Sequence, residues 1–200
     1  MTKSIMLVGV GGQGTILASK LLTIGLMEAG YDVKMSEIHG MSQRGGSVSS
    51  QVRYSEEGVY SPVIEIGGAD MIVSFEKMEA LRYLKYLKPK GKIVANNYRL
   101  NSVSTLVGKF EYKEDEIDAE LKKLNATVID AAKKAEELGN AKVMNVILLG
   151  SLVKSMSLEN INWEDIIRKN VKEKFIDLNL NAFKEGIKLV GNKEEAVATV

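Results

Sequence analysis

A glycine-rich turn between two apolar segments is the feature of this sequence that most constrains its fold. The spacing G-x-G-x-x-G is matched by Gly9-Val10-Gly11-Gly12-Gln13-Gly14. The turn follows a short run of branched apolar residues, 4–9, and precedes a longer apolar segment, 15–29. The short run predicts a buried strand, and the broad apolar stripe predicts a helix that is covered on more than one side. Strand, tight turn and helix in this order indicate an α/β fold.

The rest of the chain continues the alternation of strands and helices. Gly30 is placed to end the first helix, and residues 31–36 are predicted to be a second strand, which completes a right-handed parallel βαβ unit. Further predicted strands are a half-exposed one at 47–55, a buried one at 71–75, and two more at 92–96 and 127–130. The predicted helices are one at 76–87 ended by Pro89 and Gly91, two beginning at Glu114 and Ala131, and a final one with the apolar stripe Ile176, Leu180, Phe183, Ile187 and Val190. We therefore expect one domain over residues 1–200, a Rossmann-like three-layer α/β sandwich with a mostly parallel sheet and a helical C-terminal third.

The composition excludes several kinds of site. The chain has no cysteine and a single histidine, His39. Disulfides, an ordinary iron–sulfur cluster and an ordinary structural zinc site are therefore not expected in it. The formal net charge of +1 argues against binding to nucleic acid through bulk charge. No apolar stretch approaches the ~20 residues that span a bilayer, and no signal peptide is evident, so we expect a cytoplasmic protein without a membrane contact.

The glycine-rich turn is itself a candidate binding site. Its glycines let backbone N–H groups approach an anion, and the following helix presents the positive end of its dipole. Glu37 stands 23 positions after Gly14, where a ribose-binding carboxylate of a dinucleotide site is found. Three interpretations remain open at this point. The turn binds a dinucleotide, it binds another anion or a partner protein, or it only packs the strand against the helix.

A second polar segment carries the less common residues. Residues 37–46 combine a carboxylate, an imidazole, a hydroxyl, an amide and a guanidinium with three glycines. Arg44 beside Gly45 and Gly46 is suited to a phosphate or carboxylate, because it offers a fork of donors next to free backbone amides. A Ser-His-acid triad within one loop would lack a nucleophile elbow, so no catalytic residue is assigned. We expect this segment to face a ligand or a partner.

A partial thiamine diphosphate signature is also present. Gly68-Ala69-Asp70 stands 26 residues before Asn96-Asn97, which imitates the family signature Gly-Asp-Gly followed by Asn-Asn. The order of the first three residues differs, and Asp70 precedes a predicted strand instead of following one. We therefore expect no thiamine diphosphate, and no metal, to be bound by this chain alone.

Together, the turn at 9–14 and the segment Glu37-Ile38-His39-Gly40-Met41-Ser42-Gln43-Arg44-Gly45-Gly46-Ser47-Val48 resemble the gamma-type subunits of the 2-oxoacid:ferredoxin oxidoreductases. The resemblance covers roughly residues 4–190. The turn is shared widely across that family, whereas the His-Gly-Met-Ser-Gln-Arg-Gly-Gly sequence is more specific and favours the indolepyruvate branch. Arg53 and the entry into the strand at Gly68-Ala69-Asp70 are similar as well.

The resemblance implies a function and a set of partners. The family decarboxylates a 2-oxoacid oxidatively with coenzyme A as co-substrate and ferredoxin as electron acceptor. Thiamine diphosphate, magnesium and the iron–sulfur clusters lie in other domains or in the large catalytic subunit, so this chain would be an obligatory subunit that is inactive alone and meets ferredoxin only indirectly. An uncovered partner surface would favour a homodimer of the isolated chain. The expected ligand- or partner-facing residues are Gly9, Gly11, Gly12, Gln13, Gly14, Thr15, Glu37, His39, Gly40, Met41, Ser42, Gln43, Arg44, Gly45 and Gly46.

Two alternatives to the subunit interpretation follow from the residues themselves. The first is a free-standing Rossmann-type protein that binds NAD or another nucleotide at the turn, since the spacing permits it. The second is a scaffold protein that binds no ligand. Tight binding of NAD(H) would favour the first, and loop substitutions that alter only assembly would favour the second.

Overall fold

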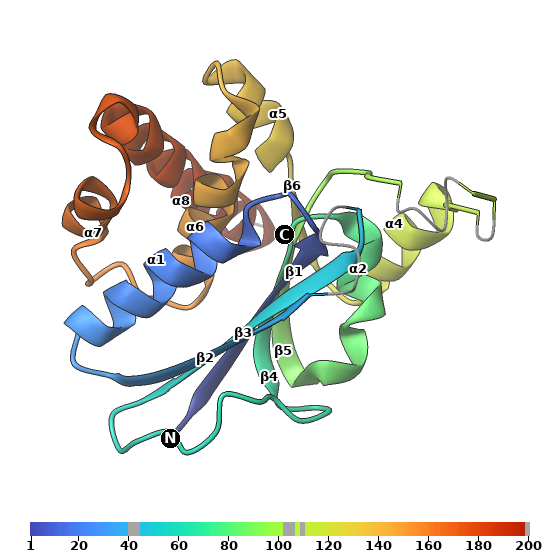
Figure 1. The fold of residues 1–200 in the computed structure, drawn as a ribbon. Helices are drawn as coiled ribbons and strands as arrows, with labels where there is room; N and C mark the ends of the chain where they lie inside the picture. The colour runs from blue at the N-terminus through green and yellow to red at the C-terminus, as the bar shows by residue number, and fades with distance from the viewer. Residues whose placement is uncertain (40–44, 102–106, 109–110, 199–200) are drawn as a thin grey trace.

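A computed structural model of the protein describes residues 1–39, 45–101, 107–108 and 111–198. The strands are β1 (Lys3–Val10), β2 (Asp32–His39), β3 (Ser47–Ser55), β4 (Ala69–Ser74), β5 (Leu87–Asn96) and β6 (Thr127–Ile129). The α-helices are α1 (Thr15–Glu28), α2 (Lys77–Arg82), α4 (Glu114–Lys123), α5 (Ala131–Glu137), α6 (Met144–Ser155), α7 (Trp163–Asn170) and α8 (Ile176–Ala198), and the short 3-10 turns are η1 (Leu84–Tyr86), η2 (Ala141–Val143) and η3 (Glu173–Phe175). Figure 1 shows three layers, with α1 and α5 to α8 on one face of the sheet and α2 and α4 on the other.

The six strands form one mixed sheet in the order β2-β3-β1-β4-β5-β6. The strands β1, β4, β5 and β6 are parallel, whereas β3 is antiparallel to both of its neighbours. The strands β1 and β2 therefore point in the same direction, as the predicted βαβ unit requires. They are not adjacent, however, because β3 lies between them. The α/β three-layer fold with a mostly parallel sheet is confirmed.

The prediction that 47–55 is a half-exposed strand is wrong. Most of β3 is buried, including the polar residues Ser49, Ser50 and Gln51. The reason is its internal position, since strands flank it on both sides and α1 packs over it. The buried amide of Gln51 has a partner, because its Oε1 accepts the backbone N–H of Ile64 at 2.6 Å. The alternating polarity of this strand therefore does not mark a solvent-facing side, and the buried Gln51 is satisfied by an internal partner.

The helix predicted at 76–87 is shorter than expected. The helix α2 ends at Arg82, η1 follows, and Pro89 and Gly91 lie inside β5. The pairing of β5 with β4 shifts in this stretch, and Lys90 has a positive φ of 66°. Proline cannot donate a hydrogen bond to a sheet, so it is accommodated where the ladder is interrupted. The same residues that suggested a helix end thus form an irregular strand entry.

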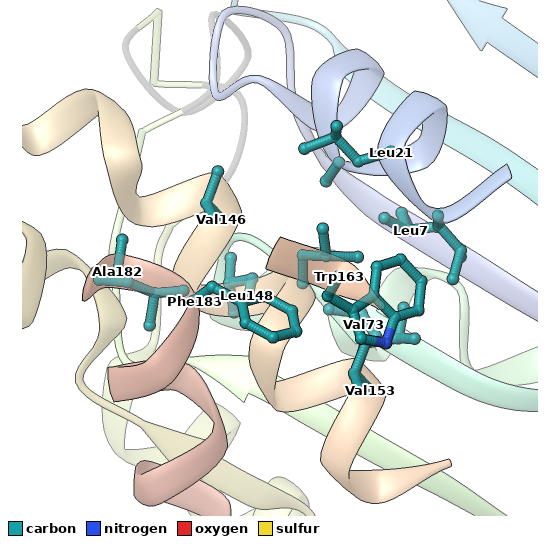
Figure 2. Packing of buried hydrophobic residues seen from close by; sticks show 14 of the residues in the cluster. Leu7, Leu21, Val73, Val146, Leu148, Val153, Trp163, Ala182 and Phe183 are labelled. Atoms are coloured by element: carbon teal, nitrogen blue, oxygen red, sulfur yellow. The ribbon is translucent and has the colours of Figure 1, made fainter. Parts of the chain in front are cut away.

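The main core lies between the sheet and the helices α1, α6, α7 and α8. Figure 2 shows Leu7 and Val73 of the sheet close to Trp163 of α7 and to side chains of α6 and α8. The helix α6 is buried almost all around, and the predicted stripe of α8 is confirmed, with Leu180 and Phe183 buried. Within the described residues, no helix is long and apolar enough to cross a membrane.

Candidate functional site

The glycine-rich turn is held by the side chain of Gln13. Its Oε1 accepts the backbone N–H of Val10 at 2.7 Å, and its Nε2 donates to the carbonyl oxygen of Phe75 at 3.1 Å. A Cβ atom at Gly9 would lie 2.7 Å from Gln13 Oε1 and 2.9 Å from the Cβ of Phe75. The close approach therefore requires glycine at position 9. Gln13 was expected to face a ligand or partner, and much of its hydrogen-bonding capacity already ties β1 to the end of β4.

The helix α1 begins without a side-chain cap. Gly14 is the N-cap residue with φ 85°, a left-handed conformation that favours glycine. A Cβ atom there would lie 2.6 Å from Nδ2 of Asn145 on α6. Thr15 is buried at the first helical position. The turn therefore presents backbone, and no charged side chain, at the start of the helix.

An open, mainly apolar cleft of about 870 Å³ adjoins this turn. It lies beyond the carboxyl ends of β1, β5 and β6, which is where open α/β sheets place their ligands. Its walls are Gly11, Gly12, Gln13, Gly14, Leu17, Tyr98, Leu100, Ala132, Glu136, Asn140, Ala141, Lys142, Val143, Met144, Asn145, Asn170, Val171, Lys172, Phe175 and Asn179. Only the glycine-rich turn among these was identified from the sequence. Apart from Leu17 of α1, the other walls come from the loop after β5 and from helices and loops further along the chain, and no local pattern signals that they meet here.

The two predicted segments lie side by side in their described parts. The backbone N–H of Gly11 donates to the carbonyl oxygen of Gly46 at 2.8 Å. The N–H of Gly45 in turn donates to the carbonyl oxygen of Gly11 at 3.4 Å. The turn after β1 and the end of the segment after β2 are thus joined through backbone. Of the expected site residues, Gly40, Met41, Ser42, Gln43 and Arg44 lie outside the described residues.

Glu37 and His39 do not contribute to the cleft. Both belong to β2, which runs two residues beyond Glu37, whereas the strand was predicted to cover only residues 31–36. Glu37 Oε2 lies 3.5 Å from His39 Nε2, and Glu37 Oε1 accepts from the hydroxyl of Ser19 on α1 at 3.4 Å. Neither residue lines the cleft. The carboxylate placed by spacing for a ribose therefore faces α1 at the sheet edge.

The partial thiamine signature is divided between opposite ends of the sheet. Asp70 stands near the start of β4, where it accepts the backbone N–H of Ser4 and the Nζ of Lys88, each at 2.8 Å. Asn96 ends β5, and its Nδ2 contacts the carbonyl oxygen of Phe75 at 3.3 Å. Because β4 and β5 are parallel, the two groups are far from a common ligand. Within the described part of the chain, no three His, Asp or Glu side chains form a group that could hold a metal ion.

A network of buried charged side chains lies at the start of α2, on the face of the sheet that α2 and α4 cover. Glu76 is 1% exposed, and it accepts the hydroxyl of Tyr112 at 2.5 Å and the backbone N–H of Glu79 at 3.1 Å. Burial raises the pKa of Glu76 above 4.5, and these hydrogen bonds only partly oppose that shift. The neighbouring Lys77 is also buried, and its Nζ lies 2.7 Å from Glu114 and 2.9 Å from Asp118 on α4. The sequence does not reveal this network, since each residue alone looks like an ordinary surface charge.

The raised pKa of Glu76 predicts a pH-dependent stability. Between 4.5 and its higher folded pKa, the folded protein binds more protons at this site than the unfolded chain. The contribution of Glu76 to stability should therefore rise as pH falls through that window, and it should be lost as pH rises. Urea unfolding of wild type and Glu76→Gln at pH 7 and pH 5 measures this, because the glutamine does not titrate. We expect the stability of the wild type relative to the variant to be greater at pH 5. A constant difference, or one of opposite sign, would contradict the assigned pKa direction.

Fold and site together define a Rossmann-like α/β domain with an apolar cleft beside a glycine-rich turn. The pyruvate ferredoxin/flavodoxin oxidoreductase family matches this sequence over residues 4–189. The chain therefore belongs to that family. This agrees with the resemblance drawn from the turn and from the segment at 37–48.

One curated relative is similar to the chain over nearly its full length, and two solved structures share its fold. The indolepyruvate oxidoreductase subunit IorB of Archaeoglobus fulgidus is 40% identical over 191 residues, which is 93% of this chain and 94% of that protein. The gamma subunit of a keto/oxoacid ferredoxin oxidoreductase from Geobacter sulfurreducens has a TM-score of 0.68 and 23% identity, and the match covers 94% of this chain and 98% of the other. A 2-oxoglutarate:ferredoxin oxidoreductase from Magnetococcus marinus has a TM-score of 0.72 and 22% identity, with 96% of this chain matching 31% of that longer chain. The two structures support the fold, and the archaeal relative also matches in length.

Proposed function

We propose that this chain is the small subunit of a 2-oxoacid:ferredoxin oxidoreductase that acts on indolepyruvate or a related aryl pyruvate. The observation that carries the proposal is the 40% identity to an indolepyruvate oxidoreductase subunit over nearly the full length of both chains. Residues 1–200 would form one gamma-type domain that works in the cytoplasm. The complete enzyme would convert the 2-oxoacid and coenzyme A to an acyl-CoA and carbon dioxide, and ferredoxin would accept the electrons.

The cofactors of the reaction would belong to a larger partner subunit. This chain has no cysteine to hold an iron–sulfur cluster. Its only approximation to a thiamine diphosphate signature is split between the two ends of the sheet. Thiamine diphosphate with magnesium and the clusters would therefore lie in the partner, and this chain would be inactive alone. Its role would be to complete the assembled enzyme.

The carboxyl edge of the sheet is the surface that would face the partner. The backbone of Gly11 is joined there to Gly45 and Gly46. The turn would offer backbone donors, and the neighbouring segment would add the polar groups of His39, Ser42, Gln43 and Arg44. Both segments would border the passage of the 2-oxoacid and coenzyme A.

Co-purification tests the proposal directly. The tagged chain is isolated from its native extract, and the complex is examined by mass spectrometry, visible absorbance and turnover. We expect one large, cysteine-rich partner, the broad absorbance of iron–sulfur clusters, and faster turnover of indolepyruvate than of 2-oxoglutarate. A colourless chain without such a partner would overturn the proposal. Tight binding of NADH by the isolated chain, measured by calorimetry, would instead support a free-standing nucleotide-binding protein.

Replacing Arg44 by alanine should impair the assembled enzyme while the isolated chain keeps its stability. A guanidinium fork that binds a phosphate or carboxylate makes charge-assisted hydrogen bonds, so we expect a loss of about ten- to a hundredfold in partner affinity or in kcat/KM. Arg168→Ala is the matched control, because Arg168 is exposed on α7 and does not line the cleft. Assembly and kinetics equal to wild type in Arg44→Ala would remove Arg44 from the proposed surface.

A further inference from the structure

A buried carboxylate on α2 contacts the point where the segment after β2 re-enters the sheet. Ser47 is the first residue of β3 and directly follows Gly46. Its hydroxyl donates to Oε2 of Glu79 at 2.5 Å and lies 3.2 Å from the hydroxyl of Tyr83. Glu79 and Tyr83 belong to α2 and its C-cap, which cover the face of the sheet opposite α1. The end of the segment that follows β2 is thus held by α2, from the face of the sheet opposite α1.

The carboxylate of Glu79 is fixed from several sides. The residue is 2% exposed, and its Oε1 accepts the Nε of Arg82 at 3.0 Å. Its backbone N–H is held by the side chain of Glu76 at 3.1 Å. A buried carboxylate must satisfy its oxygens with donors, and Arg82 and Ser47 supply them. Because this carboxylate is also bound by Arg82, it gives the hydroxyl of Ser47 a well-placed acceptor.

Ser47 connects this anchor to the glycine-rich turn. The residue before it, Gly46, accepts the N–H of Gly11, and Gly45 donates back to the carbonyl oxygen of Gly11. Gly45 has a φ of 79°, a left-handed conformation that favours glycine. Since glycine has no side chain, the backbone at this position must be held by its neighbours. The order of contacts is therefore Glu79, Ser47, Gly46 and Gly11. No other side-chain hydrogen bond to residues 45–47 is present in the described part of the chain.

We propose that Glu79 is a positioning residue that, through Ser47, sets the place of Gly45 and Gly46 against the glycine-rich turn. It does not touch a substrate. The expected effect of Glu79 on the assembled enzyme rests on the proposed function of the two segments. Its expected effect on the position of Gly45 and Gly46 is independent of that function.

The neighbouring Glu76 is the natural comparison. It is the N-cap residue of α2 and is equally buried, and besides the backbone N–H of Glu79 it holds the hydroxyl of Tyr112 and the backbone N–H of Leu100. Of these two carboxylates, three residues apart, only that of Glu79 contacts Ser47. Glu76→Gln keeps an oxygen that can accept the N–H of Glu79, so it should leave Gly45 and Gly46 in place. A change at Glu79 or Ser47 that removes their hydrogen bond should release them.

Amide hydrogen exchange of the full chain tests the local part of the proposal. The variants are Ser47→Ala, Ser47→Thr and Glu79→Ala, with Glu76→Gln as the matched control. We expect exchange at the amides of Gly11 and Gly45 to accelerate about tenfold or more in Ser47→Ala and Glu79→Ala, since a hydrogen bond to a charged group is lost. Ser47→Thr should restore wild-type rates because it keeps the hydroxyl, and amides in α6 should not change. Unchanged rates at Gly11, or an equal acceleration throughout the core, would overturn the proposal.

Kinetics of the complex then test the consequence for the enzyme. In Ser47→Ala we expect a several-fold increase in KM for the 2-oxoacid or for coenzyme A and a smaller decrease in kcat. Ser47→Thr should have wild-type values of both KM and kcat. Faster exchange at Gly11 with unchanged kinetics would keep Glu79 as a positioning residue and would count against the proposed role of the segments. Unchanged exchange with altered kinetics would count against Glu79 and leave the proposed function standing.

Discussion

Replacing Gly186 by alanine is expected to destabilise the protein by about 3 kcal/mol, although the same change in an open helix is stabilising. Gly186 lies inside α8 where this helix crosses α6. A Cβ atom there would lie 2.0 Å from the carbonyl oxygen of Ile147 and 3.0 Å from the backbone N of Ser151. Backbone cannot rotate away as a side chain can, so the two helices must separate. The hydroxyl of Ser151, which donates to the carbonyl oxygen of Gly186 at 3.1 Å, would lose that partner as well.

Thermal unfolding measures the effect, which for a chain of this size corresponds to a decrease of roughly 6–12 °C in Tm. Gly191→Ala is the matched control, because Gly191 lies on the same helix with nothing within 4 Å of the added Cβ. The control should leave Tm unchanged or raise it slightly. If Gly186→Ala were as stable as the control, the close crossing of α6 and α8 would be wrong.

Replacing Trp163 by alanine is expected to cost about 3–5 kcal/mol. Trp163 is 3% exposed, and its ring packs against Phe183 with the centroids 6.0 Å apart (Figure 2). It also fills the space beside Gly25 of α1, where an added Cβ would lie 2.5 Å from the indole ring. Its Nε1 donates to the carbonyl oxygen of Leu158 at 2.8 Å. Removal of the ring would therefore open a cavity between α1, α7 and α8.

Chemical denaturation of Trp163→Ala checks the size of this effect, with Tyr60→Ala as the control. Tyr60 is fully exposed, at 101% relative exposure, so its removal should change stability by less than about 0.5 kcal/mol. Trp163→Phe should lie between the wild type and the alanine variant. The helix α7 leads into Val171 and Lys172 at the wall of the cleft. A loss in Trp163→Ala no larger than that of the control would show that Trp163 does not hold α7 in place.

Local sequence patterns were sufficient where the interactions are local. The apolar run, the glycine-rich turn and the apolar segment after it predicted β1 and α1, and Gly30, with φ 91°, follows the helix as expected. The stripe containing Leu180 and Phe183 predicted the buried face of α8. Such patterns repeat within one or two turns or strands, so neighbouring residues are enough to reveal them.

The tertiary structure decided everything that depends on which distant segments meet. No local pattern places β3 between β1 and β2, and for that reason a mostly buried strand was predicted to be half-exposed. The cleft likewise depends on the meeting of distant segments, since its walls include Gly11 of the turn together with Asn145 and Asn179 from two later helices.

The glycine-rich turn, the absence of cysteine and the type of each early element were therefore determined by the sequence alone. The contact of Glu79 with Ser47 and that of Gly11 with Gly46 were decided by the tertiary structure. The physical reason is that burial and hydrogen-bond partners are properties of the packed chain. A carboxylate such as Glu79 looks like a surface charge until the helix that carries it is placed against the sheet.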